Sequence, residues 1–232
     1  GVEKGPAQQG SNNMTEHPGG RAAGQVRVWD IFVRIFHWAL VVAYFIAYLT
    51  EDDVMILHVW AGYIVGGLIV LRIFWGVVGT RHARFSDFAF GPRAAARYML
   101  QLVTFRAPRH LGHSPAGGFM VYLLLASLLV AVATGIAAYG AENKGPLAPL
   151  FSTGQSVALP ALIAPAYADD DDDDDRRNGG EHGDEFWEEV HEVFANLTII
   201  LVIAHIAGVA LASLAHWENL VRSMITGRKR AP

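Results

Sequence analysis

The chain contains no cysteine among its 232 residues. This excludes disulfides, zinc–thiolate sites, iron–sulfur clusters and the C-x-x-C-H attachment of a c-type haem. Charged residues are also scarce, at 17%, whereas 52% of the residues are hydrophobic. The hydrophobic residues gather in long runs, which is typical of a membrane protein. Because the chain has no cysteine, a haem would have to be held by coordination and packing alone.

Four apolar runs are each long enough to cross a bilayer, which takes about 20 residues of helix. They cover residues 28–49, 54–78, 119–139 and 190–215. Because the first two are joined by a very short acidic turn, we expect them to form an antiparallel hairpin. The sequence therefore predicts an all-α integral membrane protein with a four-transmembrane-helix bundle.

The segments outside the runs differ sharply in composition. Residues 1–25 read as a disordered polar tail, residues 26–225 as the membrane domain, and residues 226–232 as a basic tail. The connection 140–189 is interrupted by prolines and contains seven consecutive aspartates, Asp169–Asp175, which we expect to stay solvated. Between spans 2 and 3, Pro92 to Phe105 is amphipathic and is predicted to be a helix lying in the membrane interface.

Arginine is concentrated in the N-terminal flank, in the 79–117 connection and in the C-terminal tail. Basic segments favour the cytoplasmic side of a membrane. Four spans with both termini in the cytoplasm place all three segments there, and put the acidic 140–189 loop in the periplasm of a bacterium. A fifth span within residues 147–167 would move the basic tail outside. We therefore expect a multi-pass protein of the bacterial inner membrane.

Four histidines are predicted to lie within the spans. His191 and His205 are 14 residues apart in the fourth run, which is close to four helical turns, so both lie on one face about 21 Å apart. By depth, His58 matches His191 near the periplasm, and His37 matches His205 near the cytoplasm. Ionisable residues inside a span indicate function. Imidazoles facing each other in a bundle suit bis-histidine haem ligation, so the sequence predicts two non-covalent b-type haems.

Three glycines are candidates for making room beside a flat macrocycle. Gly62 and Gly66 follow His58 at steps of four and share its helix face, and Gly208 follows His205 by three. The alternative is that these glycines serve close helix–helix packing.

Two arginines are candidates for pairing with haem propionates near the cytoplasmic level. Arg34 lies one turn before His37, and Arg72 lies 14 residues beyond His58. A guanidinium fork fits a carboxylate well, although interfacial snorkelling is the alternative. His113 is interpreted as a helix-entry residue. No ligand role is assigned to His17, His82, His110, His182 or His216.

These residues form a pattern that resembles the bacterial cytochrome b561 family, which includes the b-type cytochrome subunits of membrane nickel–iron hydrogenases. The resemblance covers about residues 26–225 and rests on the spans' motifs and on two loop signatures: Arg34-x-x-His37-Trp38, His58 with Gly62, His191 with His205, residues 79–85 and residues 113–118. It implies haem b ligated by the first, second and fourth helices, with His37 opposite His205 and His58 opposite His191. The long Asp-rich loop departs from compact members and leaves the partner open.

We therefore expect a membrane cytochrome that carries electrons across the bilayer between the quinone pool and a periplasmic redox protein such as a c-type cytochrome. We expect it to contact membrane lipid and not to bind nucleic acid. A homodimer is compatible with the sequence. No acid–base pair or nucleophile stands out, so any catalysis is redox chemistry of the cofactor.

Two alternatives stay open. One is the cytochrome b anchor subunit of a hydrogenase or dehydrogenase. The other is a metal transporter or sensor that uses the same histidines for Zn²⁺ or Ni²⁺. Against the second, Glu188, Glu189 and Glu192 lie only at the periplasmic edge, so the spans offer no carboxylate to complete such a site.

Overall fold

The computed structural model describes residue 1 and residues 24–51, 54–149 and 181–231. The Asp169–Asp175 run, most of the 1–25 tail and the segment considered as a fifth span lie outside the described residues.

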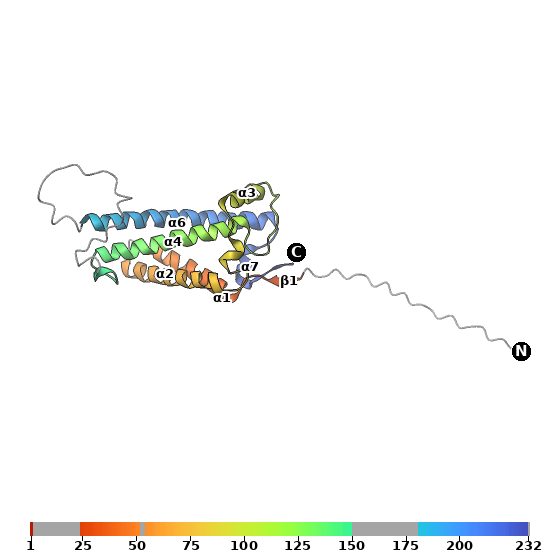
Figure 1. Ribbon diagram of the computed structural model, residues 1–232, viewed down its shortest axis with the longest axis horizontal. Coiled ribbons are helices and arrows are strands. Elements are labelled where there is room, and N and C mark those ends of the chain that lie inside the picture. The colour runs from red at the N-terminus through yellow and green to blue at the C-terminus, as the bar shows by residue number, and fades with distance from the viewer. Residues whose placement is uncertain (2–23, 52–53, 150–180, 232) are drawn as a thin grey trace.

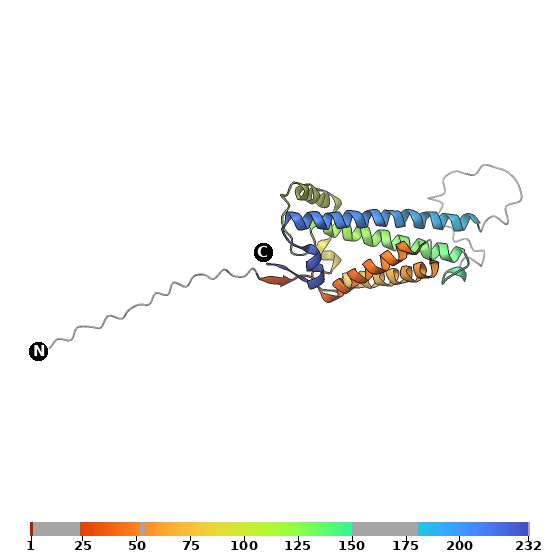
Figure 2. The same ribbon diagram turned by 180° about the vertical axis from the view of Figure 1, so that it is seen from behind.

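Four long helices run side by side along the longest axis of the molecule (Figure 1 and Figure 2). They are α1 (Ile31–Leu49), α2 (Met55–Val78), α4 (Pro115–Ala141) and α6 (Glu181–Ala215). Each is long and apolar enough to cross a membrane. The prediction of an all-α, four-span membrane bundle is confirmed.

Two of the helices begin earlier than the apolar runs indicate. α4 starts at Pro115 rather than at residue 119, because the Ser114 hydroxyl accepts a hydrogen bond from the Gly117 N–H at 3.2 Å and proline suits the first helical position. α6 starts at Glu181 rather than at residue 190.

Five short elements gather at one end of the bundle, which we call the strand end (Figure 1). They are η1 (Phe85–Phe88), α3 (Pro92–Val103), α7 (Leu220–Thr226), β1 (Gln25–Arg27) and β2 (Arg228–Arg230). β1 and β2 pair antiparallel, with Val26 opposite Lys229. The two ends of the membrane domain are thereby joined. The other end, with the turn between α1 and α2, is called the loop end.

α3 is the amphipathic helix predicted between spans 2 and 3. Tyr98 and Leu102 are buried against the bundle, where α3 contacts α4, while Leu100 and Val103 stay exposed. An exposed apolar face beside the arginines of α3 suits a helix at a membrane surface.

The helices pack unevenly around the bundle. α1 packs against α2, α4 makes its most extensive contacts with α6, and α2 packs against α4. Within the described residues, α6 has at most minor backbone contact with α1 or α2. An apolar cluster of Ala43, Val65, Ile69 and Leu128 joins α1, α2 and α4 halfway along their length. α6 is therefore held by α4 and stands apart from the α1–α2 hairpin.

A charged clamp fastens the C-terminal segment at the strand end. The Arg109 guanidinium donates to both carboxylate oxygens of Glu218, at 3.1 and 3.2 Å, and to the carbonyls of Arg230 and Ala231. Burial raises the pKa of Glu218, but the hydrogen bonds from Arg109 and the Arg230 N–H, with the nearby cations, outweigh it and leave the pKa lowered.

We predict that Arg109→Gln loosens this clamp and costs about 1–3 kcal/mol, because a partly buried carboxylate loses its charged partner. The thermal stability of the purified protein in detergent measures the loss. Because the folded pKa of Glu218 is lowered, its stabilisation is complete above its ordinary value of 4.5 and is lost as the pH falls below it. Arg106→Gln, at an exposed neighbouring arginine, is the control. Equal melting temperatures for the two variants would contradict the clamp.

Candidate functional site

The four span histidines form two facing pairs. The ring centroids of His37 on α1 and His205 on α6 are 6.4 Å apart, and those of His58 on α2 and His191 on α6 are 6.0 Å apart. Both pairs bridge the separation between α6 and the α1–α2 hairpin. The pairing deduced from depth is the pairing that the structure shows.

The two pairs lie at different heights because α6 supplies one histidine to each. His191, Thr198 and His205 are spaced seven residues apart, so they share one face of α6. Thr198 is fully buried midway between them and shares a hydrogen bond with Ser127 of α4. This polar contact holds the middle of α6 against α4 while both imidazoles face the hairpin.

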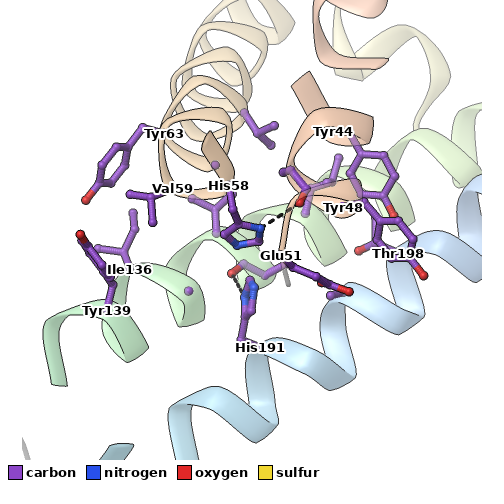
Figure 3. Close-up of a pocket in the computed structure, with 18 residues that line it drawn as sticks. Tyr44, Tyr48, Glu51, His58, Val59, Tyr63, Ile136, Tyr139, His191 and Thr198 are labelled. Atoms are coloured by element: carbon purple, nitrogen blue, oxygen red, sulfur yellow. Dashed lines mark hydrogen bonds between the residues drawn. The ribbon is translucent and has the colours of Figure 1, made fainter. Parts of the chain in front are cut away.

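A cavity surrounds the pair nearer the loop end (Figure 3). Its empty volume, counting the space open to the surroundings at its mouth, is about 750 Å³. The imidazoles of His58 and His191 face each other across it, and Gly62 and Thr198 lie in its wall. It is further lined by four tyrosines and one acid: Tyr44, Tyr48, Tyr63, Tyr139 and Glu51.

Backbone carbonyls fix which nitrogen of each ring points into the cavity. His58 Nδ1 is 2.9 Å from the Ala47 carbonyl, and His191 Nδ1 is 2.8 Å from the Ala131 carbonyl. A carbonyl only accepts, so each Nδ1 carries the proton and donates. The Nε2 lone pair of each ring is then available as a ligand, and metal-bound histidines usually donate their other ring N–H to an acceptor of this kind.

Gly135 is a site residue that the sequence reasoning missed. A Cβ at this position of α4 would lie 2.9 Å from Cε1 and 3.0 Å from Nδ1 of His191. The missing side chain therefore lets the imidazole lie directly against α4. The available signal was a glycine within an apolar span, which often marks close approach.

The three glycines singled out from the sequence lie in different surroundings. A Cβ on Gly62 or Gly208 would meet nothing within 4 Å, so both border open space. A Cβ on Gly66 would lie 3.0 Å from Val132 of α4, which places Gly66 in a helix contact.

The two arginines singled out from the sequence are not brought together. Arg34 lies against the backbone of Gly227 and lines an open, mostly apolar groove together with Trp38 and Ile225. Arg72 is only 3% exposed, donates to the Ala83 carbonyl at 3.1 Å and lies over the ring of Phe85. Each has an enclosed nitrogen without a hydrogen-bond partner, Nε of Arg34 and Nη1 of Arg72.

The spacing of the imidazoles tests whether these pairs fit a haem iron. Metal–imidazole bonds are about 2.0 Å long and a ring centroid lies about 1 Å behind its bonding nitrogen, so two rings on one metal have centroids about 6 Å apart. The separations of 6.4 and 6.0 Å agree with this value. In the described ranges, 24–51, 54–149 and 181–231, no three potential metal ligands gather into one cluster. The donor sets are pairs.

The family model for prokaryotic cytochrome b561 matches residues 28–227. The chain belongs to the prokaryotic cytochrome b561 family. This cytochrome b561 is a multi-pass membrane protein that binds b-type haem and transfers electrons in the membrane. No curated protein and no solved structure was found to match it.

We predict that Gly135→Ala lowers the haem content of this cytochrome b561, because the added methyl group displaces the ring of His191. A pyridine haemochrome assay on the purified protein measures haem per chain. Gly67→Ala is the matched control, since a Cβ there meets nothing within 4 Å. Full haem content in Gly135→Ala would show that the close approach of His191 to α4 has no role in binding.

Proposed function

We propose that this cytochrome b561 holds two b-type haems and carries electrons across the bilayer between the quinone pool and a periplasmic redox protein. His37 and His205 ligate one haem at the level near the strand end, and His58 and His191 ligate the other near the loop end. The observation that carries the proposal is the spacing of both imidazole pairs, 6.4 and 6.0 Å, at the value for two rings on one metal.

Three further features support two haem sites. The Nδ1 bonds of His58 and His191 leave Nε2 free as a ligand. Gly62 and Gly208 border open space on the helices that carry ligands, as room for a macrocycle requires. In this assignment Gly66 contributes by letting α2 approach α4, and the enclosed nitrogens of Arg34 and Arg72 are donors for propionates.

The bound haems supply reversible one-electron chemistry at iron. The chain's own residues hold and orient the cofactors and exclude water. α6 contributes a ligand to each site, so one rigid helix fixes the distance between them. The apolar cluster of Ala43, Val65, Ile69 and Leu128 lies between the two levels and keeps water out of the space that separates them.

The distribution of arginine supports a proposed orientation in the membrane. The strand end carries exposed arginines on β1, α3, α7 and β2, among them Arg27, Arg93, Arg222 and Arg228. The positive-inside rule places this end, with both termini, in the cytoplasm of a bacterium with the protein in its inner membrane. The haem held by His58 and His191 then faces the periplasm.

Quinone within the membrane and a periplasmic c-type cytochrome are the partners that fit this arrangement. In the sequence the Asp169–Asp175 run falls between α4 and α6, in the connection that the proposed orientation assigns to the periplasm, and it would steer a positively charged partner. A cytochrome b anchor subunit of a hydrogenase or dehydrogenase would use the same haem sites. Purification separates these alternatives, because an anchor subunit brings its catalytic partner with it. A metal transporter or sensor would need further ligands beside each histidine pair, and among the described residues no group of three potential metal ligands is found.

We predict that His205→Ala removes the haem near the strand end and leaves the other largely bound, because only one of the two levels loses a ligand. Haem per chain and the reduced-minus-oxidised spectrum measure the change. His216→Ala, just beyond the end of α6, is the control and retains both haems. Two haems at full occupancy in His205→Ala would overturn the ligand assignment, and a wild-type spectrum without sharp α-bands would overturn the haem proposal itself.

Deleting Asp169–Asp175 is expected to leave haem content unchanged and to weaken the salt dependence of reduction by a basic cytochrome, because long-range attraction is screened by salt. Stopped-flow reduction rates at several ionic strengths measure this. Replacing the run by an equal number of serines keeps the length as a control. Identical salt dependence in all three proteins would remove the steering role.

A further inference from the structure

Unsatisfied polar atoms gather at the strand end of the bundle. Within the described residues, the enclosed side-chain atoms without a hydrogen-bond partner are Arg34 Nε, His37 Nδ1, Tyr44 Oη, Arg72 Nη1 and His113 Nδ1. All except the tyrosine oxygen are nitrogens near the strand end. An unpaired buried donor costs about 1–3 kcal/mol, and more when it is charged, so native proteins rarely leave several close together. Their common position indicates an acceptor that the protein chain does not itself supply.

Two cations at this end are buried without a carboxylate in contact. Arg72 is 3% exposed and Lys229 is 7% exposed. The ion pairs among the described side chains are Arg109–Glu218 and Lys144–Glu142. Asp30 is near Arg72, but its oxygens accept bonds from Val33, Trp75 and Thr80 instead. Buried charges are normally paired, so an anion is the acceptor that fits.

The two loop signatures build the surroundings of these groups. In residues 79–85, the Ala83 carbonyl accepts a bond from Arg72 and the Phe85 ring lies under its guanidinium at 4.8 Å. Gly76 on α2 has no side chain, and a Cβ there would collide with the Phe85 ring. This glycine lets Phe85 close over the face of α2 that carries Arg72.

The second signature, residues 113–118, brings His113 to the same place. Its ring lies between Trp29 at 4.7 Å and Phe88 at 4.2 Å. A Cβ on Gly118 would lie 2.8 Å from the Phe88 carbonyl, so this glycine allows the first turn of α4 to approach η1. The ring of His113 is fixed on both sides and its Nδ1 is enclosed without a partner.

The charged and titratable groups that face His113 are Arg72 from α2, Lys229 from β2 and His82 from the connecting loop. Burial, followed by these neighbouring positive groups, lowers the pKa of His113 to about 3. Among these groups alone the ring is neutral at physiological pH. A carboxylate beside it would raise its pKa, and in either protonation state an imidazole has an N–H to donate.

We propose that His113 is a positioning residue that donates from Nδ1 to a propionate carboxylate of the haem held by His37 and His205, within a cationic cluster of Arg72, His113 and Lys229. The inference rests on the proposed function, because it requires a haem at that level. It assigns both loop signatures to one task, which is to enclose an anionic group beside the ligands. Arg72 and Lys229 supply the charge, and His113 supplies an oriented N–H donor.

The test uses the full chain with His58→Ala as background, so that only the haem near the strand end is observed. His113→Leu removes the donor. His113→Asn keeps an amide N–H close to the position of Nδ1. His110→Leu is the matched control, because Nδ1 of His110 is 3.0 Å from the Pro108 carbonyl in the same connection. Should the leucine variant fail to accumulate, His113→Gln replaces it, since its amide lies nearer the position of Nε2.

Two readouts separate this role from a packing role. The first is the haem midpoint potential as a function of pH. Without the donor, the carboxylate charge is less neutralised and stabilises ferric iron, so the potential of His113→Leu falls near neutral pH, and a raised propionate pKa brings its titration toward that range. The second is the propionate bending mode in the resonance Raman spectrum, which shifts when a hydrogen bond is lost. His113→Asn is expected to retain most of both properties, and His110→Leu all of them.

The outcomes distinguish the two proposals. If the His58→Ala background binds no haem, the haem at His37 and His205 is wrong and the role of His113 falls with it. If the background binds one haem and His113→Leu leaves its potential, pH dependence and Raman mode unchanged, only the role of His113 is overturned. If His113→Asn changes as much as His113→Leu, the ring acts by packing and the proposed hydrogen bond is wrong.

Discussion

The arrangement of this protein depends on the separation between α6 and the α1–α2 hairpin. Two imidazole pairs face each other across it at 6.4 and 6.0 Å, while backbone contact between α6 and either helix of the hairpin is minor or absent. α4 makes this possible because it packs against both α2 and α6. Direct helix packing thus joins α4 to α2 and to α6. Between α6 and the α1–α2 hairpin, the distance between facing imidazoles suits a metal ion bound by both rings.

Small and polar residues of α4 maintain that spacing. Gly135 lets the ring of His191 approach the helix backbone, the Ala131 carbonyl fixes its Nδ1, and Ser127 bonds to Thr198 midway between the two histidines of α6. In a bilayer there is little hydrophobic drive between helices, so close approach and hydrogen bonds carry more of the association. α4 supplies no proposed ligand, yet it sets the direction in which the ligands of α6 point.

The strand end serves a different purpose from the spans. Its β1–β2 pair and the Arg109–Glu218 clamp join the two ends of the membrane domain. The same layer buries Arg72 and Lys229 beside aromatic rings. Burying these charges carries a desolvation penalty, which anions or water in contact with them would offset. This layer also concentrates exposed arginines at one end of the bundle, and the proposed orientation in the membrane rests on this charge asymmetry.

The sequence by itself determined the four spans and the choice of facing histidines, because apolar length and helical periodicity are local properties. From these alone His37 is matched to His205 and His58 to His191. Only the tertiary structure decided which neighbours act on them. Gly135 and the carbonyls of Ala47 and Ala131 reach the rings from other helices. Every residue has a backbone carbonyl, so the residue type does not indicate which carbonyl accepts a hydrogen bond. Gly62 and Gly66 share one face of α2, yet only Gly66 contacts α4. The helical periodicity of α2 shows which residues share a face, but it does not show where α4 packs against that face.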